Sequence, residues 1–64
     1  MNGPMIEYEQ ALLADIRLLQ KRAARGEAVR AADVTALLVR YGTSFELLPR
    51  YLQVEIDRIE LADC

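Results

Sequence analysis

Apolar residues recur every three to four positions over the first part of the chain, and this spacing predicts one long amphipathic helix at about residues 5–25. No Gly or Pro interrupts the segment, and most of its residues are good helix formers. Gly26 directly follows the last periodic position and is expected to end the helix. The apolar row of this helix consists of Met5, Tyr8, Leu12, Ile16, Leu19 and Ala23.

A second apolar pattern predicts a shorter helix at about residues 31–41, with a stop at Gly42. Two caps compete for its start. With Arg30 as the cap, Val29 and Val34 would stand at the spacing of a hydrophobic staple. Asp33 is the better cap by residue type, and it would start the helix later. The expected buried row is Val34, Leu37, Leu38 and Tyr41.

A third helical pattern covers about residues 44–62 and contains a proline that should break or kink it. Thr43 and Glu46 stand at the spacing of a capping box. Pro49 comes too late for the first turn of that helix, so we expect either a short turn before Pro49 and a main helix after it, or a kink. One apolar row should be formed by Leu48, Leu52, Ile56 and Ile59, and an adjoining one by Tyr51, Val54 and Leu61.

Together these patterns predict an all-α protein, in which a long N-terminal helix and a helical hairpin form a single helical domain over residues 1–64. The chain is 53% hydrophobic, and a domain this short buries only about 60% of its unfolded surface. We therefore expect a homodimer to complete the fold. The stripe expected at the dimer contact or in the core is Tyr8, Leu12, Ile16 and Leu19.

Residue types that carry catalysis or bind metals are scarce in this sequence. It contains no His and a single Cys, and Ser44 has no base near it in sequence. We expect no enzyme, no catalytic or metal-binding residue, no cofactor and no small-molecule ligand. Cysteine usage fits a reducing compartment, and no apolar run is long enough to span a membrane. A cytoplasmic location without membrane contact is therefore expected.

Two charged residues project onto the apolar side of the last predicted helix. Glu55 and Arg58 fall among the apolar positions and not on the polar side of that helix. Charges are seldom buried unpaired, so these two could form an i, i+3 ion pair at the edge of the core. Alternatively, they could fix the register of a dimer or meet a partner protein.

Tyrosine and arginine are favoured anchors at protein interfaces, and several of them lie near predicted helix ends. Tyr41 stands beside the Gly42 turn, and Arg22 and Arg25 belong to the basic end of the long helix. The candidate partner contacts are Tyr41, Tyr51, Glu55, Arg58, Arg22 and Arg25.

The net charge of −2 does not indicate a nucleic-acid partner. The helix–turn–helix at residues 34–56 places apolar and acidic residues and a proline where a DNA-reading helix needs polar and basic ones. We expect a small interaction module that binds a protein partner stoichiometrically, such as an inhibitor or anti-activator of a host regulator or machine, of the kind that phages encode. The alternative is a small dimeric transcription regulator that binds DNA through the basic end of its long helix.

Overall fold

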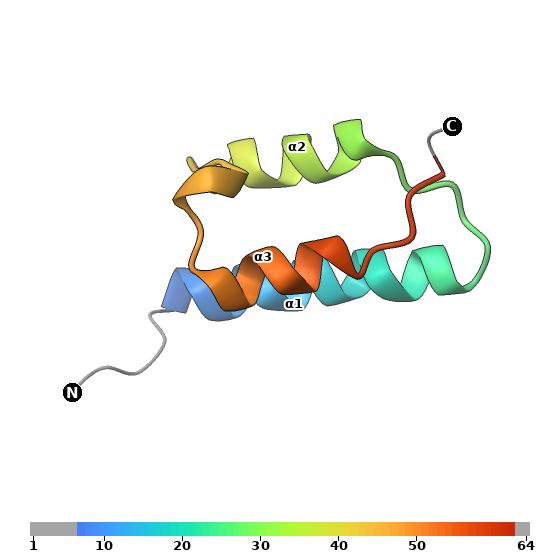
Figure 1. Ribbon diagram of the computed structural model, residues 1–64, viewed down its shortest axis with the longest axis horizontal. Coiled ribbons are helices and arrows are strands. Elements are labelled where there is room, and N and C mark those ends of the chain that lie inside the picture. The colour runs from blue at the N-terminus through green and yellow to red at the C-terminus, as the bar shows by residue number, and fades with distance from the viewer. Residues whose placement is uncertain (1–6, 63–64) are drawn as a thin grey trace.

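The computed structural model describes residues 7–62, and every regular element in that range is a helix (Figure 1). Helix α1 spans Glu7–Ala24, α2 spans Ala31–Arg40 and α3 spans Arg50–Asp57, and one short 3₁₀ helix, η1, spans Phe45–Leu47. The prediction of an all-α chain with three helices is confirmed. Met5 lies outside the described residues.

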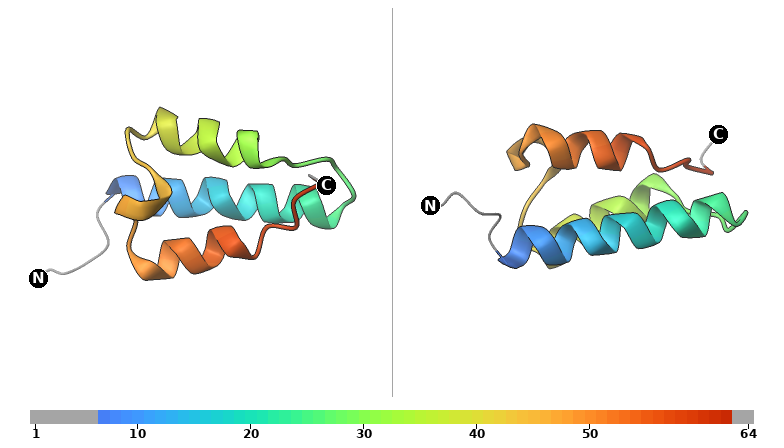
Figure 2. Two further views of the ribbon diagram at one scale, coloured as in Figure 1. Left: turned by 45° about the horizontal axis from the view of Figure 1, so that its top comes forward. Right: turned by 90° about the horizontal axis from the view of Figure 1, so that it is seen from below.

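The three α-helices lie with their axes roughly aligned (Figures 1 and 2). α1 and α2 run in opposite directions, and α3 runs in the same direction as α1. η1 lies in the connection from α2 to α3. Figure 2 shows α1 with α2 along one side and α3 along another, so the long helix forms a seam with each of the shorter ones.

The core is a cluster of aliphatic side chains from all three helices, from the connections between them and from the segment that follows α3. Leu12 and Ile16 are 0% exposed and Leu19 is 8% exposed, whereas Tyr8 at the start of the same stripe is 40% exposed. A single chain therefore covers most of this stripe, and these three residues need no second copy for their burial. The buried core residues are Leu12, Ile16, Leu19, Val29, Val34, Leu37, Leu38, Leu48, Leu52 and Ile59.

Both glycine stops are observed where the sequence predicts them. Gly26 has a φ of 92° and Gly42 a φ of 69°, a left-handed conformation that residues with a Cβ seldom adopt. After α1, the N–H of Glu27 donates to the carbonyl of Arg22 at 3.0 Å, and the equivalent bond after α2 is also 3.0 Å. Both helices thus end in a Schellman motif, which satisfies carbonyls that would otherwise lack a partner.

α2 begins after Arg30, as expected from the staple and not from Asp33 as the cap. The Arg30 N–H donates to Oδ2 of Asp33 at 3.0 Å, which is half of a capping box. The Arg30 side chain has no acceptor for the reverse bond. Val29 and Val34 are 1% and 8% exposed in the core, so the staple provides the anchoring that the cap side chain lacks.

The third helical segment ends earlier than predicted: α3 stops at Asp57 and does not continue to about residue 62, so the predicted end was wrong. The capping box between Thr43 and Glu46 does not form, because the Thr43 hydroxyl donates to the Ser44 carbonyl at 3.4 Å and Ser44 precedes only the 3₁₀ turn η1. α3 starts directly after Pro49, which is the first of the two expected alternatives.

α3 ends at Asp57 because the chain then turns toward the connection between α1 and α2 (Figure 1). The N–H of Ala62 donates to the carbonyl of Val29 at 2.7 Å. In a continued helix this N–H would bond to the carbonyl of Arg58 instead. A contact between distant parts of the chain thus replaces the last helical turn.

The two apolar rows predicted for the third segment have different environments. The row Tyr51, Val54 and Leu61 stays 40%, 36% and 44% exposed. The other row, Leu48, Leu52, Ile56 and Ile59, faces the core. Ile56 is partly buried, and the other three residues are buried.

Candidate functional site

The seam between α1 and α3 is held by side-chain hydrogen bonds near both of its ends. Near the start of α3, the Tyr51 hydroxyl donates to Oε1 of Glu9 at 2.8 Å. Further along, Nε2 of Gln20 donates both to the Glu55 carbonyl at 2.7 Å and to its Oε1 at 3.0 Å. These bonds fix the position of α3 on α1 and orient the side chains that remain exposed beside them.

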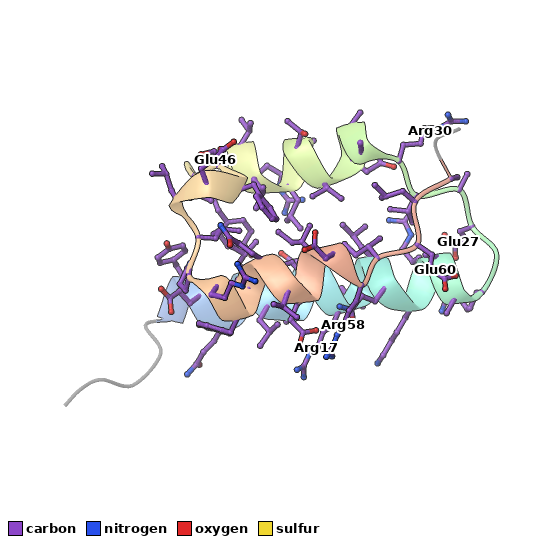
Figure 3. The ribbon with its side chains drawn as sticks, in the orientation of Figure 1. Arg17, Glu27, Arg30, Glu46, Arg58 and Glu60 are labelled. Carbon is purple, nitrogen blue, oxygen red and sulfur yellow. The ribbon has the colours of Figure 1, made fainter. Side chains whose placement is uncertain are left out.

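Glu55 and Arg58 contact each other within one chain. The Glu55 carboxylate lies 3.6 Å from the Arg58 guanidinium and 3.9 Å from that of Arg17, and its side chain is 17% exposed. Figure 3 shows Arg17 and Arg58 at the same edge of the molecule. The hydrogen bond from Gln20 lowers the pKa of Glu55 and the two arginines lower it further, while partial burial opposes them. This is the arrangement expected for an ion pair at the edge of the core.

Tyr51 lies in a small apolar surface. Tyr51 is 40% exposed, and so is Tyr8, the neighbour in α1 of its hydrogen-bond partner Glu9. Val54 lies one turn further along α3 and is 36% exposed. We call Tyr8, Tyr51 and Val54 the Tyr51 patch. Burial of its ring, followed by the hydrogen bond to Glu9, raises the pKa of Tyr51 to about 12.

Tyr41 links α2 to α1 at the other seam. Its hydroxyl donates to Oδ2 of Asp15 at 2.6 Å, and its ring is half-buried against the core. The hydrogen bond to Asp15 is the main cause that raises the pKa of Tyr41. The hydroxyl that the sequence offers as a partner contact therefore has an intrachain partner.

The basic end of α1 is partly neutralised by the residue that follows Gly26. Nε of Arg22 lies 2.9 Å from Oε1 of Glu27, and a terminal nitrogen of Arg25 lies 2.9 Å from its Oε2. These two hydrogen bonds lower the pKa of Glu27. Arg22 and Arg25 thus share one carboxylate, and the free positive charge at this end is smaller than the sequence indicates.

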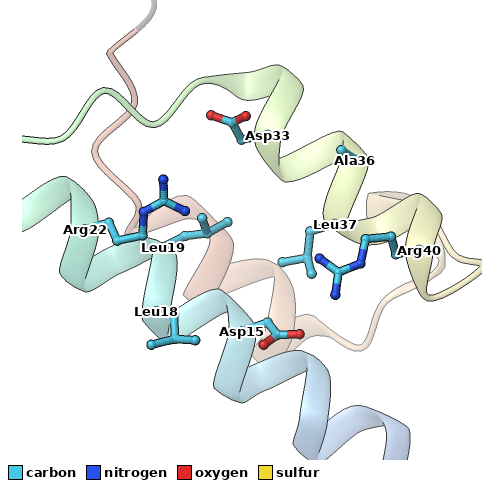
Figure 4. Close-up of a pocket in the computed structure, with 8 residues that line it drawn as sticks. All are labelled: Asp15, Leu18, Leu19, Arg22, Asp33, Ala36, Leu37 and Arg40. Atoms are coloured by element: carbon cyan, nitrogen blue, oxygen red, sulfur yellow. The ribbon is translucent and has the colours of Figure 1, made fainter.

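A groove of about 310 Å³ lies between α1 and α2 (Figure 4). Two buried leucines, Leu19 and Leu37, form the floor of its apolar part. Leu18 also lines it and is 56% exposed. Charged side chains stand at both ends of the groove. We call this surface the α1–α2 groove, and its lining residues are Asp15, Leu18, Leu19, Arg22, Asp33, Ala36, Leu37 and Arg40.

Four residues of this groove stand out in the sequence for other reasons: Leu19 and Leu37 for the core, Asp33 as a candidate cap and Arg22 for the basic helix end. The missed signal is that an Asp and an Arg stand seven residues apart twice, in segments 15–22 and 33–40. Each spacing places acid and base on one helix face. Pattern alone does not show that the two faces meet, because this depends on how the helices align.

Among the described residues no group of three or more His, Cys, Asp or Glu side chains could hold a metal ion. No helix in the described range has the length and apolar character needed to cross a membrane. The chain matches no protein-family model, no curated protein and no solved structure.

Proposed function

We propose that this protein is a small non-enzymatic interaction module that binds a protein partner stoichiometrically, with the Tyr51 patch as the contact surface. In this role it would act as an inhibitor or anti-activator of a host regulator or machine. The observation that carries the proposal is Tyr51 itself. This residue is 40% exposed, and its hydroxyl already donates a hydrogen bond to Glu9.

A tyrosine held in this way suits an interface anchor. Aromatic side chains supply much of the binding free energy at interfaces, and an anchor that is already oriented loses less conformational entropy on binding. Tyr8 and Val54 extend the apolar area around it, and both are at least 36% exposed. A partner that covers the patch would remove apolar surface from water without breaking the bond to Glu9.

The alternative of DNA binding through the basic end of α1 receives less support from the charges. Glu27 pairs with both Arg22 and Arg25 at 2.9 Å, so its negative charge offsets part of the positive charge at this end of α1 and weakens its attraction for phosphate groups. A salt titration with random duplex DNA tests this alternative directly. Binding that weakens steeply with salt would favour it over the protein-binding proposal.

The experiment that tests the proposal compares two valine-sized positions on different helices. The partner is first captured from the cells that produce the protein, identified by mass spectrometry and purified. Calorimetric titration should then give one chain per partner site. Val54→Glu places a carboxylate in the Tyr51 patch and should weaken binding at least about tenfold. Thr35→Glu is the matched control, because Thr35 has the shape of valine and is exposed on α2.

Both variants should retain the wild-type helical circular dichroism, since both positions are exposed. Equal partner affinity for wild type, Val54→Glu and Thr35→Glu would contradict the patch as the contact. If far less than one chain per partner site were enough to convert the partner chemically, stoichiometric binding itself would be contradicted.

A further inference from the structure

α1 and α2 carry the same short residue pattern on the faces that meet at the α1–α2 groove. Segments 15–22 and 33–40 each begin with Asp and end with Arg. In both, the second residue is a buried β-branched one and the fifth a buried Leu. The matching pairs are Asp15 and Asp33, Ile16 and Val34, Leu19 and Leu37, and Arg22 and Arg40.

The antiparallel course of the helices gives this repetition its consequence. Because α2 runs opposite to α1, the Asp of one helix lies at the same end of the groove as the Arg of the other (Figure 4). Asp15 and Arg40 stand at one end, and Arg22 and Asp33 at the other. The four charges therefore alternate in sign around the groove, like the squares of a two-by-two chequerboard.

Such a face is complementary to itself. If a second copy is turned over about a twofold axis in the plane of the face, every acid meets a base. This holds whether the axis runs along the helices or across them. A face with both acids on one helix, or both at one end, would bring like charges together in one of these two orientations. We propose that the α1–α2 groove binds the same face of a second copy of this chain.

The centre of the face supplies apolar contact. Leu18 is 56% exposed on α1, and the small side chain of Ala36 is exposed on α2. Between them lies the groove of about 310 Å³ over Leu19 and Leu37. In the pair, Leu18 of each copy packs against the groove of the other. The apolar centre contributes affinity, and the charged rim selects the orientation.

The charged side chains retain capacity for these contacts. Asp15 and Asp33 each accept one intrachain hydrogen bond through a single oxygen, and a carboxylate has about four acceptor sites. Arg22 uses its Nε for its intrachain ion pair. Arg40 forms no ion pair with any of the described residues. Association thus adds ion pairs without first breaking those of the single chain.

The inference does not depend on the proposed function. The groove lies on the α1–α2 seam, whereas the Tyr51 patch lies on the α1–α3 seam. Val54→Glu should therefore leave self-association unchanged even where it weakens partner binding. The two proposals can fail separately.

Sedimentation equilibrium of the full chain tests the inference. Wild type should approach twice the 7.3 kDa of one chain as its concentration rises. Leu18→Glu should shift the mass to that of one chain, because two like charges would meet the apolar centre of the pair. Leu47→Glu is the matched control: this leucine is 73% exposed, lies in η1 outside the groove and should leave the mass unchanged.

A wild-type chain that stays at 7.3 kDa up to millimolar concentration would overturn the inference. So would equal masses for Leu18→Glu and Leu47→Glu. Both positions are exposed, so both variants are expected to fold, and circular dichroism checks this before sedimentation.

A charge exchange gives the sharper test. Arg22→Glu with Arg40→Glu makes the face wholly acidic, and Asp15→Lys with Asp33→Lys in a second chain makes it wholly basic. Each double variant alone should remain a monomer, whereas an equimolar mixture of the two should form a mixed dimer that dissociates as salt is added. A mixture that stays single would overturn the inference, as would double variants that associate like wild type. If the basic double variant loses helicity, the comparison of Leu18→Glu with Leu47→Glu decides alone.

Discussion

The two seams of α1 use the same kinds of side chain in opposite ways. At the α1–α3 seam, Gln20 and Arg17 of α1 both meet Glu55, and Glu9 meets Tyr51, so charges and donors are matched within the chain. At the α1–α2 seam, acids and bases stand at the same groove ends, yet none of them forms an ion pair across the groove in the described residues. The first seam is closed by its polar groups, and the second leaves them available.

This difference separates stability from recognition. A polar group bonded inside the chain contributes to folding and has little left for a partner, whereas an exposed one beside an apolar groove has its binding capacity intact. Tyr41 is the exception at the open seam, because its hydroxyl donates to Asp15 at 2.6 Å. Removing a hydrogen bond of the α1–α3 seam should therefore reduce the free energy of unfolding, and changing a charge of the α1–α2 groove should mainly alter self-association.

The largest loss of stability is expected from substitutions of buried residues of α1 in the core that both seams share. Leu12 is 0% exposed, and Leu12→Asp would bury a carboxylate without a partner. We expect loss of the cooperative thermal transition by circular dichroism, since a cost of several kcal/mol is comparable to the total stability of a small domain. Leu19→Asp should act in the same way. Leu47→Asp, at an exposed position, is the control and should melt like wild type. Native helicity and unchanged mass in both core variants would refute the assignment of this stripe to the core.

A smaller loss is expected from opening the α1–α3 seam. Gln20→Ala removes both hydrogen bonds to Glu55 and should lower the free energy of unfolding by about 1–2 kcal/mol in urea titrations. Lys21→Ala, at the next and exposed position, controls for the gain in helix propensity. If the two variants are equally stable, the Gln20 bonds do not hold this seam.

The elements of this fold that could be predicted from sequence are those set by local interactions. Gly26 and Gly42 end their helices because few other residues adopt a positive φ, and the Val29–Val34 staple joins residues that are close together in sequence. The end of α3 could not be predicted in this way. It depends on the bond from Ala62 to Val29, between residues far apart in sequence.

The coverage of the long stripe and the candidate surfaces likewise depend on tertiary arrangement. In the sequence, the apolar stripe that contains Leu12 and Ile16 looks too large for a short chain to bury without a second copy. The shorter helices nevertheless pack against these two residues and leave 0% of each exposed. Tyr51 is visible in the sequence as an aromatic anchor, but the bond that orients it comes from Glu9 on another helix. Asp33 and Arg40 become residues of the α1–α2 groove only because α2 packs antiparallel to α1.

Tyr41→Phe, at the α1–α2 seam, should lower the free energy of unfolding by less than Gln20→Ala does. This change removes only the hydroxyl that donates to Asp15, and it should lower the free energy of unfolding by about 1 kcal/mol. The ring keeps its contact with the core. A loss as large as that of Gln20→Ala, or larger, would mean that the α1–α2 seam is no more weakly tied than the α1–α3 seam.

The smallest expected effect is the loss of stability when Tyr51, in the α1–α3 seam, ionises at alkaline pH. The pKa of Tyr51 is raised from 10.0 to about 12, because partial burial and the bond to Glu9 both favour the neutral phenol. Since the folded pKa lies above the unfolded one, this contribution to stability is fully present below pH 10 and is lost as the pH rises toward 12. In an absorbance titration of the tyrosinates, Tyr51→Phe should remove a group that ionises near the upper end of this range. If that variant instead removes a group that ionises near pH 10, the Tyr51–Glu9 hydrogen bond does not persist in solution. The α1–α3 seam would then lack its hydrogen bond at the Tyr51 patch.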